Sequence, residues 1–149
     1  MRRDVVLIGA ALAIASCYVL ALAYAVNFAI NLSFPRWWLS TFGSSGTAVL
    51  SWSSFSHTVT VFAVSVPFAW LIARLYGKSS IPVAAGIGAA TWLYFEAYAV
   101  YLIVQSPKFL TLWFADTLAF AVALPCLVLV LVKVSRSGRH KYEVRRPGE

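Results

Sequence analysis

Four long apolar runs constrain the folds that this sequence can adopt. They cover residues 5–26, 48–73, 81–105 and 110–132. A helix of about 20 residues rises about 30 Å, which matches the hydrocarbon thickness of a bilayer. Inside a bilayer each segment must satisfy its own backbone hydrogen bonds, which favours helices. The runs therefore predict an all-α membrane protein with four transmembrane helices.

The composition argues against an ordinary soluble domain. Of the 149 residues, 61% are hydrophobic and only 11% are charged, whereas soluble domains carry about 25% charged residues. The net charge is +7, but the basic residues lie beside the apolar runs, as in membrane proteins. We therefore expect the bilayer as a partner and no nucleic acid, because no basic face interleaves with aromatic residues in a soluble segment.

The distribution of Lys and Arg predicts the orientation. Short connections between the last three spans predict antiparallel neighbours, and an excess of positive charge marks the cytoplasmic side. The bias therefore predicts an antiparallel bundle in the plasma or inner membrane, with both termini in the cytoplasm. The larger group holds Arg2, Arg3, Arg74, Lys78, Lys133, Arg136, Arg139, Lys141, Arg145 and Arg146, and the smaller holds Arg36 and Lys108.

The first outer loop, expected from Asn27 to Thr47, contains a second predicted element. Residues 35–42 begin with a proline, which suits the first turn of a helix. Trp37 and Trp38 follow, and tryptophan favours the head-group level of a bilayer. We expect a short interfacial helix that lies along the outer leaflet and is anchored by these two rings.

Residues 133–149 form a basic cytoplasmic tail beyond a transmembrane domain of residues 1–132. The tail has too few apolar residues to form a core. Clustered cations beside a membrane span attract anionic lipid head groups; a partner protein is the alternative. The head-group candidates are Arg136, Arg139, Lys141, Arg145 and Arg146.

Three ionisable residues fall inside the predicted spans, namely His57, Glu96 and Asp116. A charge inside a bilayer is costly, so such residues usually face the bundle interior and mark proton or ion paths. His57 and Glu96 both lie about nine residues from the outer end of their spans, or about 13 Å deep. Asp116 lies nearer the surface. The three helices thus place these groups in the same half of the membrane.

Each of these three residues can have a structural role instead of a functional one. Glu96 is a candidate proton or cation site, because a buried carboxyl can exchange a proton near neutral pH. It is equally a candidate for a neutral interhelical hydrogen bond. For His57 we favour the structural reading, since nearby hydroxyls can satisfy one imidazole. For Asp116 we favour a helix cap or a pair with Lys108.

The residues that share a helix face with Glu96 and with His57 indicate the surroundings of these two groups. On the third span a face of small residues, which includes Ala85 and Ala89, is expected to carry Glu96 into the protein. On the second span Ser53, His57 and Thr60 form a polar stripe. Such a stripe can line a hydrated cavity, or its hydroxyls can bond the carbonyls of their own helix.

The sequence carries no signature of a cofactor, and no cofactor is expected. Cys17 and Cys126 lie in different spans, without a CxxC pair or metal-binding spacing. A mixed site of His57, Glu96 and Asp116 could hold a metal, but no motif supports it. No serine-nucleophile elbow, phosphate loop or zinc-protease helix is present.

The leading functional hypothesis is a non-enzymatic subunit or accessory protein of a larger or homo-oligomeric membrane complex. Four helices of this length leave little room to enclose a solvated path, and small-residue faces suit assembly. The alternative is a small proton- or cation-linked transporter or channel that uses Glu96, His57 and Asp116. A membrane enzyme is the third option, and only Arg36 in the outer loops offers it a further catalytic group.

Overall fold

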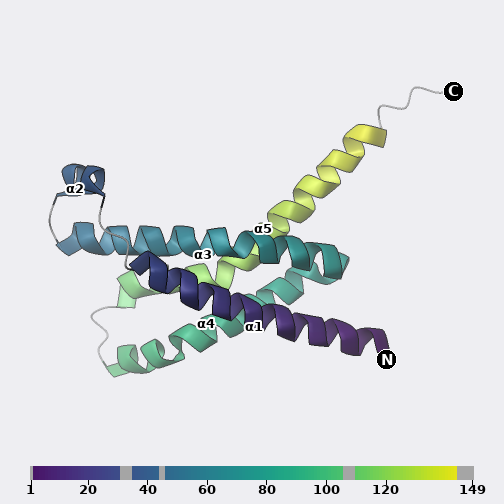
Figure 1. Cartoon of the computed structure of the whole chain (residues 1–149), viewed down its shortest axis with the longest axis horizontal. Coiled ribbons are helices and arrows are strands. Elements are labelled where there is room, and N and C mark those ends of the chain that lie inside the picture. Colours follow the sequence, from purple (N-terminus) through teal and green to yellow (C-terminus); the bar gives the residue numbers. More distant parts are fainter. Residues whose placement is uncertain (1, 31–34, 44–45, 106–109, 144–149) are drawn as a thin grey trace.

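In the computed structural model, described for residues 2–30, 35–43, 46–105 and 110–143, the chain is helical except at Pro35 and Gly43. Four long helices form the body of the molecule, and a short helix lies beside the start of α3 (Figure 1). The described part contains no strand, as predicted. The elements are α1 (Arg2–Ile30), α2 (Arg36–Phe42), α3 (Gly46–Tyr76), the 3-10 turn η1 (Gly77–Ser79), α4 (Ser80–Gln105) and α5 (Leu110–Glu143).

Proline and glycine set the local boundaries of the helices. Pro35 precedes α2 in an extended conformation, and its carbonyl accepts hydrogen bonds from the first turn of that helix. Gly43 ends α2 with a φ of 77°, and its N–H donates to the Leu39 carbonyl. Gly77 begins η1 with a φ of 51°. Only glycine adopts such left-handed angles without strain, so both breaks follow from the sequence.

Helix α3 is the centre of the packing. It contacts α1, α2, α4 and α5, while α5 also packs along α4. Figure 1 shows α3 running across the molecule, with η1 turning the chain into α4. The buried core takes side chains from all four long helices. Its members are Ile14, Tyr18, Leu22, Val61, Ala69, Ile72, Ala84, Ile87, Ala119, Phe120, Ala123, Leu124 and Val128.

A hydrogen bond between two fully buried side chains joins α1 to α3. The hydroxyls of Tyr18 and Ser65 lie 2.6 Å apart. Ser65 already donates to the Val61 carbonyl at 2.7 Å, so Tyr18 is the donor between the two side chains. The Tyr18 ring also packs edge-on against Phe68, 5.1 Å between centroids. These contacts fix the rotation of α1 against α3.

Helices α4 and α5 meet most closely at Gly88. The carbonyl oxygen of Ala121 occupies the space that a Cβ on residue 88 would fill, and the carbonyl carbon lies 3.3 Å from that position. Ala121 is four residues before Pro125, and proline has no N–H to donate to it. The carbonyl that Pro125 leaves without its helical donor thus faces the α-hydrogens of Gly88, the geometry of a Cα–H···O contact.

The rotation of α4 corrects one prediction. Ala85 and Ala89 were expected to share a buried face with Glu96, but both are exposed on the single chain. The face turned toward α5 and α3 holds Ala84, Gly88 and Thr91. Apolar residues surround the whole helix, so hydrophobic periodicity contains no signal that fixes its rotation.

Three stretches of the described residues are long and apolar enough to cross a membrane. They are Asp4–Ala29, Ser51–Glu96 and Thr117–Ser135, and the second runs through α3, η1 and α4. Helices α1, α3 and α5 extend further than the predicted spans, and α3 reaches Tyr76. Helix α1 continues to Ile30, which shortens the expected outer loop, and α5 continues past Val132 to Glu143. The turn expected at residues 106–108 lies outside the described residues.

Candidate functional site: the surroundings of His57 and Glu96

Phe120 on α5 connects the two helices that carry the main candidate residues. The His57 ring on α3 packs edge-on against Phe120, with 5.0 Å between centroids. Phe120 also stacks on Phe95 of α4 at 4.9 Å, with 17° between the planes. Phe95 directly precedes Glu96 in the chain. His57 and Glu96 therefore belong to one region, in which α3, α4 and α5 meet around an almost fully buried phenylalanine.

Glu96 is buried, with only 7% of its surface exposed. Its immediate chain neighbour Phe95 packs in the apolar core beside Phe120. A carboxyl group in such surroundings loses the hydrogen bonds of water and needs polar partners within the protein. A direct approach of Glu96 to His57 stays a prediction.

The hydroxyl stripe on α3 bonds its own helix. Thr60 donates to the Ser56 carbonyl at 2.7 Å, and Ser56 donates to the Ser53 carbonyl at 3.0 Å. Ser53 itself is exposed on the single chain. For Thr60 the bond to the i−4 carbonyl is the one expected of a hydroxyl that serves helix packing; the role of the stripe as a whole stays a prediction.

The structure does not describe the side chains of all the predicted site residues. Residue 116 falls within α5, but the Asp116 side chain is not among the described residues. Among those that are described, no three His, Cys, Asp or Glu side chains gather as metal ligands would. Cys17 and Cys126 are free and exposed on the single chain.

The predicted head-group residues follow the apolar stretch of α5. The structure places Arg136, Arg139 and Lys141 in α5 but does not describe their side chains, and Arg145 and Arg146 lie outside the described residues.

The two interfacial anchors predicted for α2 differ in their surroundings. Trp37 is 58% exposed, whereas Trp38 is only 8% exposed. Trp38 stacks on Phe55 of α3 at 5.6 Å and meets Trp52 edge-on at 5.2 Å. The predicted helix is present, and Trp38 packs it against α3 while Trp37 stays largely exposed; anchoring of these rings at the head-group level stays a prediction.

Two features of the structure were absent from the candidate set. The Tyr18–Ser65 hydrogen bond joins residues 47 apart in the chain, and nothing in either local sequence indicates the other. Arg74 lies over the ring of Trp70, with 5.2 Å from its guanidinium carbon to the ring centroid, beside a hollow between α3 and α5. The i, i+4 spacing of these two residues on one helix was a usable signal for their contact.

Comparison with known proteins adds no family to this description. No family model matches the chain, and neither the curated proteins nor the solved structures provide a match. The fold and the surroundings of His57 and Glu96 are therefore interpreted from their own chemistry.

Proposed function

We propose that this chain is a non-enzymatic subunit or accessory protein of a membrane complex, formed with other subunits or with further copies of itself. The observation that carries the proposal is the outward face of α4. Ala85, Gly86, Ala89 and Ala90 are all exposed on the single chain. A Cβ added at Gly86 would have no atom within 4 Å. A face of small residues is thus left open in the middle of an apolar helix.

Small residues four apart let two membrane helices approach closely. Ala85 pairs with Ala89 and Gly86 with Ala90 in this spacing, which is the small-xxx-small pattern of packed membrane helices. The inner face of the same helix already uses such an approach, because Gly88 lies against the Ala121 backbone. Lipid chains gain nothing from a flat helix surface, whereas a second helix gains packing contacts.

We further propose that all four long helices cross the bilayer as an antiparallel bundle in the plasma or inner membrane. The apolar stretches and the turn of the chain at η1 support this arrangement. The excess of Lys and Arg at the α3–α4 connection and at both ends supports termini in the cytoplasm. Helix α2 then lies on the outer side.

The test of assembly is the replacement Ala89→Leu, which adds bulk to the open face of α4. The matched control is Ala13→Leu, an equally apolar change at an exposed position of α1. Native mass spectrometry of the protein extracted in mild detergent measures the mass of the complex. We expect the wild type and Ala13→Leu to retain partner subunits or further copies, and Ala89→Leu to run as a folded monomer.

Two outcomes would contradict the proposal. One is a wild-type protein that is already monomeric when extracted with its native lipids. The other is an unchanged complex in Ala89→Leu, which would exclude the open face of α4 as the contact surface. Helical content by circular dichroism separates lost assembly from lost folding.

The buried carboxyl of Glu96 supports a second candidate, a proton- or cation-linked transporter or channel. An acid in the apolar interior of a membrane protein is a functional residue by default. Glu96→Gln keeps the shape of the side chain but cannot exchange a proton. Under the first proposal, assembly and activity survive this change. A well-assembled Glu96→Gln protein that has lost a pH-dependent flux in proteoliposomes would favour the transporter instead.

A further inference from the structure

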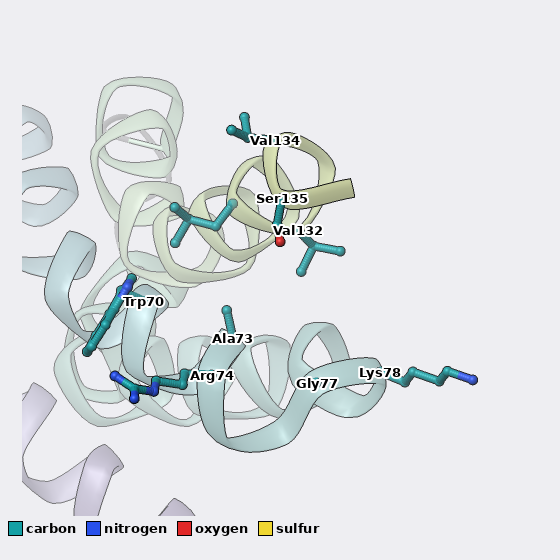
Figure 2. A pocket seen from close by; sticks show the side chains of 9 residues that line it. Trp70, Ala73, Arg74, Gly77, Lys78, Val132, Val134 and Ser135 are labelled. Carbon is teal, nitrogen blue, oxygen red and sulfur yellow. The ribbon is translucent and has the colours of Figure 1, made fainter. Parts of the chain in front are cut away.

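A hollow of about 840 Å³ lies between the end of α3 and α5 (Figure 2). Its volume falls in the range of small-molecule sites, roughly 300–1,000 Å³. The last turns of α3 and the following η1 form one wall, and α5 forms the opposite wall. The hollow is lined by Trp70, Ala73, Arg74, Gly77, Lys78, Leu131, Val132, Val134 and Ser135.

The lining separates apolar surface from positive charge. Leu131, Val132 and Val134 make the α5 wall apolar, while Arg74 and Lys78 give the other wall two cations. None of the residues that line the hollow is acidic. A ligand that fits this division has an apolar body and a negatively charged group.

The two cations lie apart along this wall, Arg74 in the last turn of α3 and Lys78 in η1. Figure 2 shows Arg74 beside the Trp70 ring and Lys78 extending outward past Gly77. A guanidinium that stacks on an aromatic face keeps the N–H donors in its plane available. Those donors match the paired oxygens of a phosphate group. Trp70 thereby holds Arg74 at the hollow without using up its hydrogen bonds.

The position of the hollow near the ends of the apolar stretches suits a lipid. Its α5 residues are the last of the apolar stretch Thr117–Ser135, and Arg74 and Lys78 stand where α3 gives way to the turn. In a chain that crosses the bilayer through these stretches, the hollow opens at the boundary between acyl chains and head groups. Basic pockets between helices at this level bind anionic lipid head groups.

We infer that the hollow between α3 and α5 binds one anionic phospholipid of the leaflet in which it opens. An acyl chain lies along Trp70, Leu131 and Val132, and the phosphate binds Arg74. Lys78, which extends outward past Gly77, adds positive charge near the head group. The site is distinct from the diffuse attraction expected of the residues beyond position 135. The inference holds for either orientation of the chain in the membrane, because either leaflet can supply anionic lipid to the hollow.

The test compares two phospholipids with identical acyl chains, phosphatidylglycerol and phosphatidylcholine. Native mass spectrometry of the purified full chain counts the lipids retained at each added concentration. We expect one phosphatidylglycerol to be held in preference to phosphatidylcholine. Removing one cation should weaken that binding about fivefold, from about 1 kcal/mol per basic residue. The variants are Arg74→Gln and, should that protein fold poorly, the exposed Lys78→Gln.

Two further variants distinguish a specific lipid site in the hollow from general electrostatic attraction between the protein and anionic lipid. Lys133→Gln removes an exposed cation that neighbours Val132 and Val134 but does not line the hollow, and we expect it to leave the binding unchanged. Ala73→Phe fills the hollow without changing any charge, and we expect it to abolish retention of the single lipid.

The inference is overturned if phosphatidylcholine is retained equally, or if Lys133→Gln weakens binding as much as Arg74→Gln. It is also overturned if glycerol phosphate displaces the lipid, because the site would then select a free phosphate. A second copy of the chain as occupant is the remaining alternative. In that case Ala73→Phe would lower the mass of the complex while the wild type retains no lipid.

Discussion

Gly88 permits the close contact between α4 and α5, because the Ala121 carbonyl occupies the place of its absent Cβ. We predict that Gly88→Ala forces the two helices apart and lowers stability by about 1–3 kcal/mol, the usual cost of overpacking. Thermal unfolding in detergent measures the effect. Gly9→Ala is the matched control on α1, where the added methyl meets open space. Equal melting temperatures for the two variants would contradict the contact.

The Tyr18–Ser65 pair gives a second prediction at the scale of single residues. Tyr18→Phe removes the hydroxyl that donates to Ser65 and should cost about 1 kcal/mol, as for other hydrogen bonds between membrane helices. Tyr24→Phe is its control, because Tyr24 lies on the same helix and is 79% exposed. The effect of Ser65→Ala should be much smaller in the Tyr18→Phe background than alone. Strict additivity of the two changes would show that the pair does not interact.

These residue contacts mark the limit of what the sequence could predict. The depth of His57 and Glu96 in the membrane could be predicted from their position within an apolar run alone, and it stays a prediction. The contact of Gly88 with Ala121 could not be predicted, because it depends on how α4 is rotated, and an apolar residue stands on every side of that helix. Tyr18 looked like any aromatic residue in a span, since its partner lies on another helix.

At the scale of elements, α2 was predicted as a helix and is one, from Arg36 to Phe42. Its position in the plane of the membrane remains to be tested. With Trp38 turned toward α3, we predict that Leu39 and Phe42 face the lipid while Ser40 faces water. Spin labels at these three exposed positions report this directly through their accessibility to oxygen. Equal exposure of all three labels to water would exclude an interfacial helix.

The ends of the helices were predictable where the sequence changes character. Proline and glycine mark both ends of α2, whereas α3 continues past the predicted residue 73 to Tyr76, just before Gly77. The end of α5 was not predicted, because a helix of polar and basic residues has no apolar pattern to indicate it. Lys, Arg and Glu are good helix formers, so the helix can continue once the apolar stretch has begun it.

At the scale of the whole molecule, the orientation in the membrane is open to a direct measurement. We predict that a cysteine at Thr41 reacts with a membrane-impermeant maleimide from outside, and that a cysteine at Ser79 does not. Both positions are exposed on the single chain. Cys17 and Cys126 are first replaced by alanine to remove their background. Labelling of Ser79 with protection of Thr41 would reverse the orientation.

Under the proposed topology, the continuation of α5 past the apolar stretch also sets how far its later residues can stand from the bilayer. From Val132 to Glu143 the helix rises by up to about 16 Å. That is twice the roughly 8 Å over which charges remain unscreened at physiological salt. A flexible tail could fold back onto the head groups along its whole length, whereas a continuous helix cannot. Under the proposed topology, the electrostatic attraction to the head groups therefore weakens toward the far end of α5.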